Sequence, residues 1–145
     1  QSPVPEEVSN RLPNALRVSR YYSEAAELAE NVAGARANGK RIETPELMED
    51  IKTFETRVDQ LVGVADSRAS DYSETECRDL MEQILTAYQS LKAKLLKAGA
   101  EGLVQVRSLV DELDTLSNIR QIGEQIEKGS RYLAALTKQG PAEDR

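Results

Sequence analysis

Apolar residues recur at alternating steps of three and four along four stretches of the chain. Because each residue advances by about 100° around an α-helix, such positions share one helical face. The clearest two stripes comprise Leu47, Ile51, Phe54, Val58, Leu61 and Ala65, and then Cys77, Met81, Ile84, Tyr88, Leu91, Leu95 and Ala98. The pattern predicts long amphipathic helices that bury one face each.

Helix start and stop signals place these helices at residues 12–37, 45–67, 74–98 and 103–138. Thr44 before Pro45 and Ser73 before Glu76 are typical of helix N-caps. Connections of about five residues favour antiparallel neighbours. The sequence therefore predicts an all-α, antiparallel up-down four-helix bundle over residues 12–138, with a linker at 1–11, a tail at 139–145 and Pro13 in the first helical turn.

The stripes also predict the buried core and one close helix contact. Gly123 lies inside the fourth helix, where glycine costs about 1 kcal/mol relative to alanine, so we expect it at a close helix–helix approach. Cys77 is expected as a small buried hydrophobe. The residues expected to be mostly buried are Leu16, Tyr22, Leu28, Ile51, Phe54, Val58, Ile84, Leu91, Leu113, Ile119 and Ile126.

Composition narrows the classes of function. The net charge of −6 argues against nucleic acid or an anionic membrane as a partner, since both favour a basic surface. The chain has no His, which removes the commonest general base and transition-metal ligand. No apolar run approaches the ~20 residues that span a bilayer. With no phosphate loop, dinucleotide motif or nucleophile elbow, no catalytic residues and no membrane insertion are predicted.

Charged residues offer two weaker kinds of site. Glu55 and Asp59 are spaced i, i+4, which places two carboxylates on one helical face where they could share a hard cation. Arg17, Arg20 and Arg120 could bind an anion such as phosphate through bidentate hydrogen bonds. The simpler interpretation of both sets is a solvated, charged helix surface.

The first helix carries a family resemblance. Residues 16–33 read LRVSRYYSEAAELAENVA, which resembles the signature helix of PhoU-type domains, approximately LRIxxDLERIGDHAxNIAE. A second, weaker copy lies in the fourth helix, where Asn118–Ile126 resembles the LERIGDHA core of that signature. The first segment is especially similar to the PhoU-like tail of bacterial membrane proteins of the sodium/phosphate cotransporter type.

The resemblance implies a non-catalytic regulatory or interaction domain of a phosphate-transport protein. The expected partners are the transporter domain of the parent protein or a second copy, on the cytoplasmic side of a membrane. PhoU proteins hold metals through acidic motifs, so the resemblance suggests Glu27 and Glu124 as metal ligands, ahead of Glu55 and Asp59. No other cofactor is expected, and the metal would be a divalent ion or iron.

Two alternatives stay open at this point. Gln1 would suit cleavage of a signal peptide, which favours an exported periplasmic sensor or structural bundle. A carboxylate metal-binding bundle with enzymatic activity is the second alternative. The missing Glu-x-x-His pairs count against that second alternative.

Overall fold

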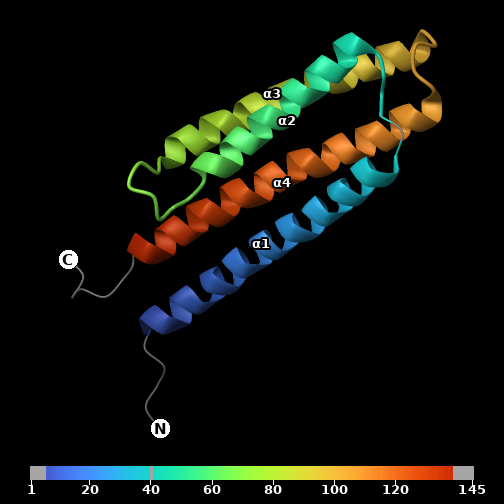
Figure 1. Ribbon diagram of the computed structural model, residues 1–145. Coiled ribbons are helices and arrows are strands. Elements are labelled where there is room, and N and C mark those ends of the chain that lie inside the picture. Colours follow the sequence, from blue (N-terminus) through green and yellow to red (C-terminus); the bar gives the residue numbers. More distant parts are fainter. Residues whose placement is uncertain (1–5, 40, 139–145) are drawn as a thin grey trace.

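The computed structural model describes residues 6–39 and 41–138, and this part of the chain contains four α-helices and no strand (Figure 1). The helices are α1 (Glu6–Asn38), α2 (Pro45–Val64), α3 (Glu74–Ala100) and α4 (Val106–Lys138). The prediction of an all-α fold with four helices is confirmed. The expected tail at 139–145 and the first five residues of the expected linker lie outside the described residues.

The helix boundaries differ from the sequence prediction at several ends. α1 begins at Glu6, so residues 6–11 are helical, and Pro13 lies inside the helix instead of in its first turn. α2 ends at Val64, before the predicted Ser67. There the carboxylate of Asp66 accepts the backbone N–H of Arg68 at 3.0 Å. Such local side-chain bonds favour a turn over continued helix.

The starts of α2 and α3 follow the predicted capping signals to different degrees. The Ser73 hydroxyl accepts the backbone N–H of Glu76 at 3.1 Å, which satisfies one of the unpaired donors of the first turn. Thr44 is in the extended N-cap conformation, but its side chain makes no capping bond. The α2 start therefore depends on Pro45, whose fixed φ suits the first turn.

Helices α2, α3 and α4 enclose the hydrophobic core. The core side chains follow the predicted stripes of α2 and α3 without interruption. Phe54 and Tyr88 pack with their ring centroids 6.1 Å apart. Cys77 is 2% exposed and its thiol donates to the carbonyl of Val64 at 3.8 Å, which confirms it as a buried side chain where α2 ends and α3 begins.

Helix α1 lies on the outside of this core, along α4 (Figure 1). Arg11 donates to the carbonyl of Leu136 at 3.2 Å, and Arg36 contacts Glu112 at the other end, so α1 and α4 run in opposite directions. Halfway along, a Cβ on Gly129 would lie 3.1 Å from the Tyr22 ring. The absence of a side chain at Gly129 therefore makes room for Tyr22.

The arrangement of α1 differs from the predicted bundle. The short α1–α2 connection predicts that these two helices are neighbours, yet within the described residues the backbone of α1 approaches only α4. The physical reason is the narrow apolar face of α1, on which Val18 and Ala25 are the buried hydrophobic side chains among those described. A face of that width can cover one helix but cannot fill the space between two.

The predicted core residues fall into three groups. The buried group comprises Ile51, Phe54, Val58, Ile84, Leu91 and Ile119. The half-buried group comprises Tyr22, Leu28, Leu113 and Ile126. Leu16 is 64% exposed, so its assignment to the core is wrong. It lies two residues from Val18, which places it about 200° around the helix from that buried position.

Gly123 lies where the sequence places it, at a close approach of α4 to the other two core helices. A Cβ at this position would lie 3.4 Å from the Met81 sulfur and 3.6 Å from the Leu61 side chain. There is room for a methyl group and nothing larger.

Candidate functional site

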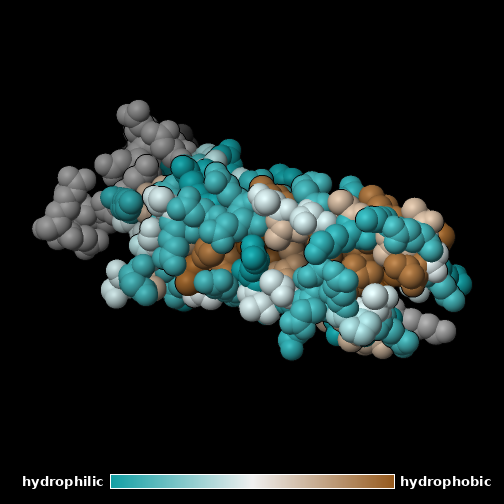
Figure 2. Space-filling view, turned by 90° about the horizontal axis from the view of Figure 1, so that it is seen from above, coloured by the Kyte–Doolittle hydropathy of each residue, from teal (hydrophilic) through white to brown (hydrophobic). Residues whose placement is uncertain are grey.

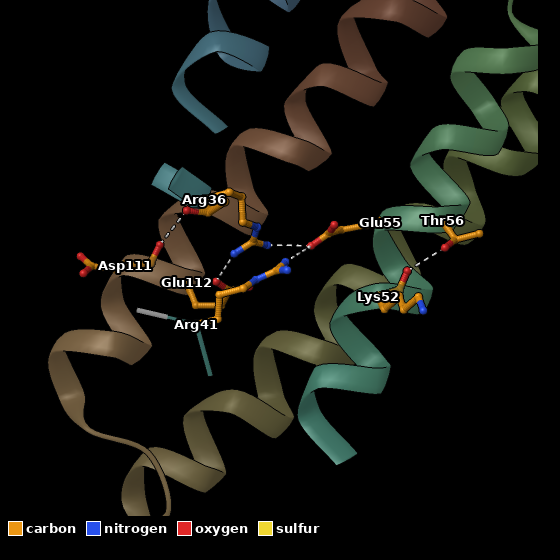
Figure 3. Close-up of polar contacts among 8 residues, drawn as sticks. Arg36, Arg41, Lys52, Glu55, Thr56, Asp111 and Glu112 are labelled. Carbon is orange, nitrogen blue, oxygen red and sulfur yellow. Dashed lines mark hydrogen bonds and ion pairs between the residues drawn. The ribbon is translucent and has the colours of Figure 1, made fainter. Parts of the chain in front are cut away.

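A cluster of charged side chains joins α1, α2 and α4 near the end of α1 (Figure 3). The guanidinium of Arg36 donates to Glu112 at 2.5 Å and to Glu55 at 2.8 Å. Arg41, in the α1–α2 connection, reaches Glu55 at 3.4 Å. We call these four residues the ion cluster. It links α1 to α2, whose backbones do not otherwise approach each other in the described part of the chain.

Burial makes this cluster sensitive to the loss of one partner. The side chains of Arg36 and Glu112 are 18% and 7% exposed. Burial alone would lower the pKa of Arg36, but hydrogen bonds and charge interactions with Glu112 and Glu55 outweigh it and raise that pKa. The guanidinium therefore stays charged, and removing it would leave the Glu112 carboxylate buried without its counterion.

Two open clefts flank the ion cluster. One has a volume of about 350 Å³ and lies between the end of α1 and the start of α4, where Asp111, Asp114 and Asn118 add polar groups. The other, of about 720 Å³, lies between the α1–α2 connection and α2, with Ile42, Met48 and Lys52 in its wall. Acidic and basic groups are mixed in both clefts, so neither is selective for one sign of charge.

The four acids expected as metal ligands are distributed over three helices. Glu27 is exposed on α1 and Asp59 is exposed on α2. Glu124 accepts a hydrogen bond from Arg120 at 2.5 Å, and Glu55 belongs to the ion cluster. In residues 6–39 and 41–138, no three His, Cys, Asp or Glu side chains are grouped as a metal site would require. Metal binding at these acids stays a prediction.

The arginines considered for anion binding are engaged with separate partners. Arg20 pairs with Glu24 at 3.0 Å, and Arg17 donates to the Tyr132 hydroxyl at 3.3 Å. Arg120 lies over the Tyr88 ring, 5.0 Å from its centroid, while it pairs with Glu124. These are pairings of the kind that stabilise helix surfaces.

Sequence reasoning missed Arg36, Arg41 and Glu112. Glu112 did carry a signal, because it lies three residues after Leu109 and four before Leu116, both buried. A carboxylate on the flank of an apolar stripe needs a cationic partner when it is buried. Which cation meets it depends on where α1 packs, and that information is not local in sequence.

Exposed aliphatic side chains gather where α3 connects to α4. Leu103, Val106 and Val110 are 64%, 69% and 49% exposed, and we call them the corner patch. The backbone N–H of Leu103 donates to the carbonyl of Ala98 at 2.9 Å, which holds the connection against the end of α3. Figure 2 shows hydrophobic residues at this end of the molecule.

Comparison with known proteins adds no relative: no protein family, no curated protein and no solved structure matches the chain. The PhoU resemblance thus rests on the residues quoted for it. None of the helices in the described residues is both long and apolar enough to cross a bilayer.

Proposed function

We propose that this chain is a non-catalytic interaction domain that regulates a membrane protein of the phosphate-transport type. The transport assignment rests on the similarity of residues 16–33 to the signature helix of PhoU-type domains. The interaction assignment rests on the corner patch.

The corner patch is the observation that carries the proposal. Its three aliphatic side chains are exposed at one connection, and Val106 and Val110 share a helical face because they are spaced i, i+4. Exposed apolar surface costs about 25 cal/mol per Å² relative to burial, so three exposed aliphatic side chains close together in sequence favour a contact site here. A cleft of about 660 Å³ adjoins Leu103 and gives a partner side chain room to enter.

The charged side chains of the ion cluster have a structural role. Both carboxylates of the cluster are neutralised by arginines, and the two arginines come from α1 and from the connection that follows it. Charges arranged in this way fix the position of α1 relative to α2 and α4.

Site-specific cross-linking tests the proposal. Cys77 is the chain's one cysteine and is buried, so Val106→Cys introduces a single accessible thiol. The variant is placed in the full-length parent protein from which other accessible cysteines have been removed, in its native membrane, and treated with a thiol-directed photo-cross-linker. We expect Val106→Cys to cross-link to a transport domain. Ser70→Cys, in the exposed α2–α3 turn, is the matched control and should give no such product.

A functional measurement completes the test. Val106→Glu in the parent protein should change the response of phosphate uptake to external phosphate, while Ser70→Glu should leave it unchanged. Equal cross-linking from both positions, or unaltered uptake with Val106→Glu, would contradict the proposed docking.

A further inference from the structure

Helix α1 contributes little to the hydrophobic core. Within the described residues, the buried side chains of that core all lie between Ile42 and Ile119, in the other three helices and the connections next to them. From α1, Val32 packs against the core and is itself only half-buried. Most of the packing in the core therefore does not depend on the position of α1.

The seam between α1 and α4 is held by a few separate contacts. Arg11 donates to a backbone carbonyl near the end of α4 at 3.2 Å, and Arg36 pairs with Glu112 at the other end of the seam. Between these ends, Val18 and Ala25 are the buried hydrophobic side chains of α1 among those described. Such small side chains bury little apolar area, so docking stabilises α1 less than packing stabilises a core helix.

The side of α4 that α1 covers carries large aliphatic side chains. Gly129 lies beneath the Tyr22 ring, and Ile122 and Leu136 share its face because each lies seven residues from it. Leu133 adjoins them, three residues before Leu136. Leu136 is buried, while Ile122 and Leu133 are half-buried. Separation of α1 would expose this row of apolar side chains, which we call the α4 stripe.

We propose that α1 is a detachable cover of the α4 stripe. It undocks as one unit while α2, α3 and α4 stay folded, so the docked form shields the stripe from other molecules and the undocked form presents it. Ile42, four residues beyond the end of α1, is 4% exposed in the core and keeps the start of α2 in place. The ion cluster holds the cover closed, because undocking separates Arg36 from both α2 and α4.

The inference uses the contacts of α1 and not the corner patch, so it stands or falls separately from the proposed docking to a transporter. It makes one specific demand, which is that α1 opens at a lower free energy than the core does.

Native-state amide hydrogen exchange of the full chain, followed by mass spectrometry, tests this demand. An isolated helix is marginal in water, so the amides of α1 exchange once it leaves α4. We expect the amides around Ala25, in the middle of α1, to exchange at least ~10-fold faster than those around Phe54, in the middle of α2, after correction for intrinsic rates. Equal protection of the two segments would show that α1 and the core open together and would overturn the inference.

A conservative core substitution separates the two kinds of opening. Ile84 lies in α3 at 0% exposure, and the backbone of α3 does not approach that of α1 in the described part of the chain. Ile84→Val weakens the docked and undocked forms equally, because the core is folded in both. It should speed exchange of the slowest α2 and α3 amides roughly 2- to 12-fold and leave α1 unchanged. Equal acceleration in α1 would mean one cooperative unit and contradict the proposal.

The ion cluster offers a matched pair of variants. Arg36→Met should speed exchange of α1 at least ~10-fold, because Glu112 is buried without a counterion only while α1 is docked. Arg41→Met is the control, since Arg41 contacts the same Glu55 but is 57% exposed, and it should change that exchange less than ~3-fold. If both variants have the same effect, the ion cluster does not hold α1 closed.

Thiol accessibility tests the separation of α1 from α4 directly. Ala25→Cys is a small change at a position 4% exposed in the seam, and Cys77, 2% exposed, is the reference thiol in the same chain. We expect alkylation at position 25 to be at least ~10-fold faster than at Cys77. Ala26→Cys, at an exposed neighbouring position, should react without any opening and gives the upper limit of the rate. A thiol at position 25 as protected as Cys77, in a variant with unchanged circular dichroism, would overturn the inference.

Discussion

The core between α2, α3 and α4 and the seam between α1 and α4 are held together by different means. The core buries large aliphatic and aromatic side chains, such as Phe54, Leu61 and Ile84, each at most 2% exposed. Along the seam, α1 buries Val18 and Ala25, places Tyr22 over Gly129 and ends in the ion cluster. Burial of apolar area therefore stabilises the core, while shape and charge position α1.

The core and the seam also differ in what makes a single substitution costly to the free energy of unfolding. Removing a core side chain leaves a cavity that the neighbours cannot fill, and its cost grows with the volume lost. Removing Arg36 from the ion cluster leaves Glu112 charged and buried, which is costly even though no large volume is lost. The predictions below test this distinction, from the largest expected effect to the smallest.

The largest effect is expected in the core. Phe54→Ala should lower the free energy of unfolding by about 3–5 kcal/mol, because a 2% exposed ring is removed from contact with Tyr88. Met48→Ala, on the same helix but 48% exposed, is the control and should change it by less than about 1 kcal/mol. Urea unfolding measures both. A loss below about 1 kcal/mol for Phe54→Ala would mean that the core is not stabilised mainly by packing.

A smaller effect is expected in the ion cluster. Arg36→Met should cost about 2–4 kcal/mol, since it leaves the Glu112 carboxylate buried without its counterion. The double variant Arg36→Met with Glu112→Leu should recover about half of that loss, because no unpaired charge remains. If the double variant is no more stable than the single one, the cost arises from lost packing and the contrast with the core disappears.

Gly123 gives a graded test of how tightly α4 packs in the core. Gly123→Leu should destabilise by about 1–3 kcal/mol, because the side chain has no space beside Met81 and Leu61. Gly123→Ala should instead stabilise by up to about 1 kcal/mol, since a methyl group fits and alanine favours the helix. Thermal unfolding of the two variants measures both effects. A Gly123→Leu protein as stable as the wild type would show that α4 can move away from α2 and α3.

The smallest effect is expected at the starts of the core helices. Ser73→Ala should cost about 1 kcal/mol, because the hydroxyl accepts the Glu76 N–H. Thr44→Ala should change stability by less than about 0.5 kcal/mol, since the Thr44 side chain makes no capping bond. Equal losses at both positions would show that capping does not distinguish the two helix starts.

The fold was predictable where the apolar pattern is wide and regular. The stripes of α2 and α3 match the buried residues because each has a single face covered by the same core. At α1 the helix was predicted correctly but its packing neighbour was not, because alanines and serines leave it only a narrow apolar face. Leu16 was assigned to the core, but its angular distance from Val18 places it on the outer surface.

The charged contacts were less predictable than the fold. Helical spacing correctly favours local pairs such as Arg20 with Glu24, because both residues lie on one helix. The ion cluster joins Arg36, Glu55 and Glu112, which are far apart in sequence. It therefore depends on tertiary packing, and no pattern within one helix encodes it.

Because Cys77 is buried, the rate of its chemical modification depends on how often the surrounding structure opens. Burial raises the pKa of its thiol, and nearby glutamates such as Glu76 add to that shift. Since the thiolate is the reactive form, an alkylating reagent should modify Cys77 only while the end of α2 separates from the start of α3. The rate of alkylation then reports how often this junction opens in the native protein, with no label and no substitution.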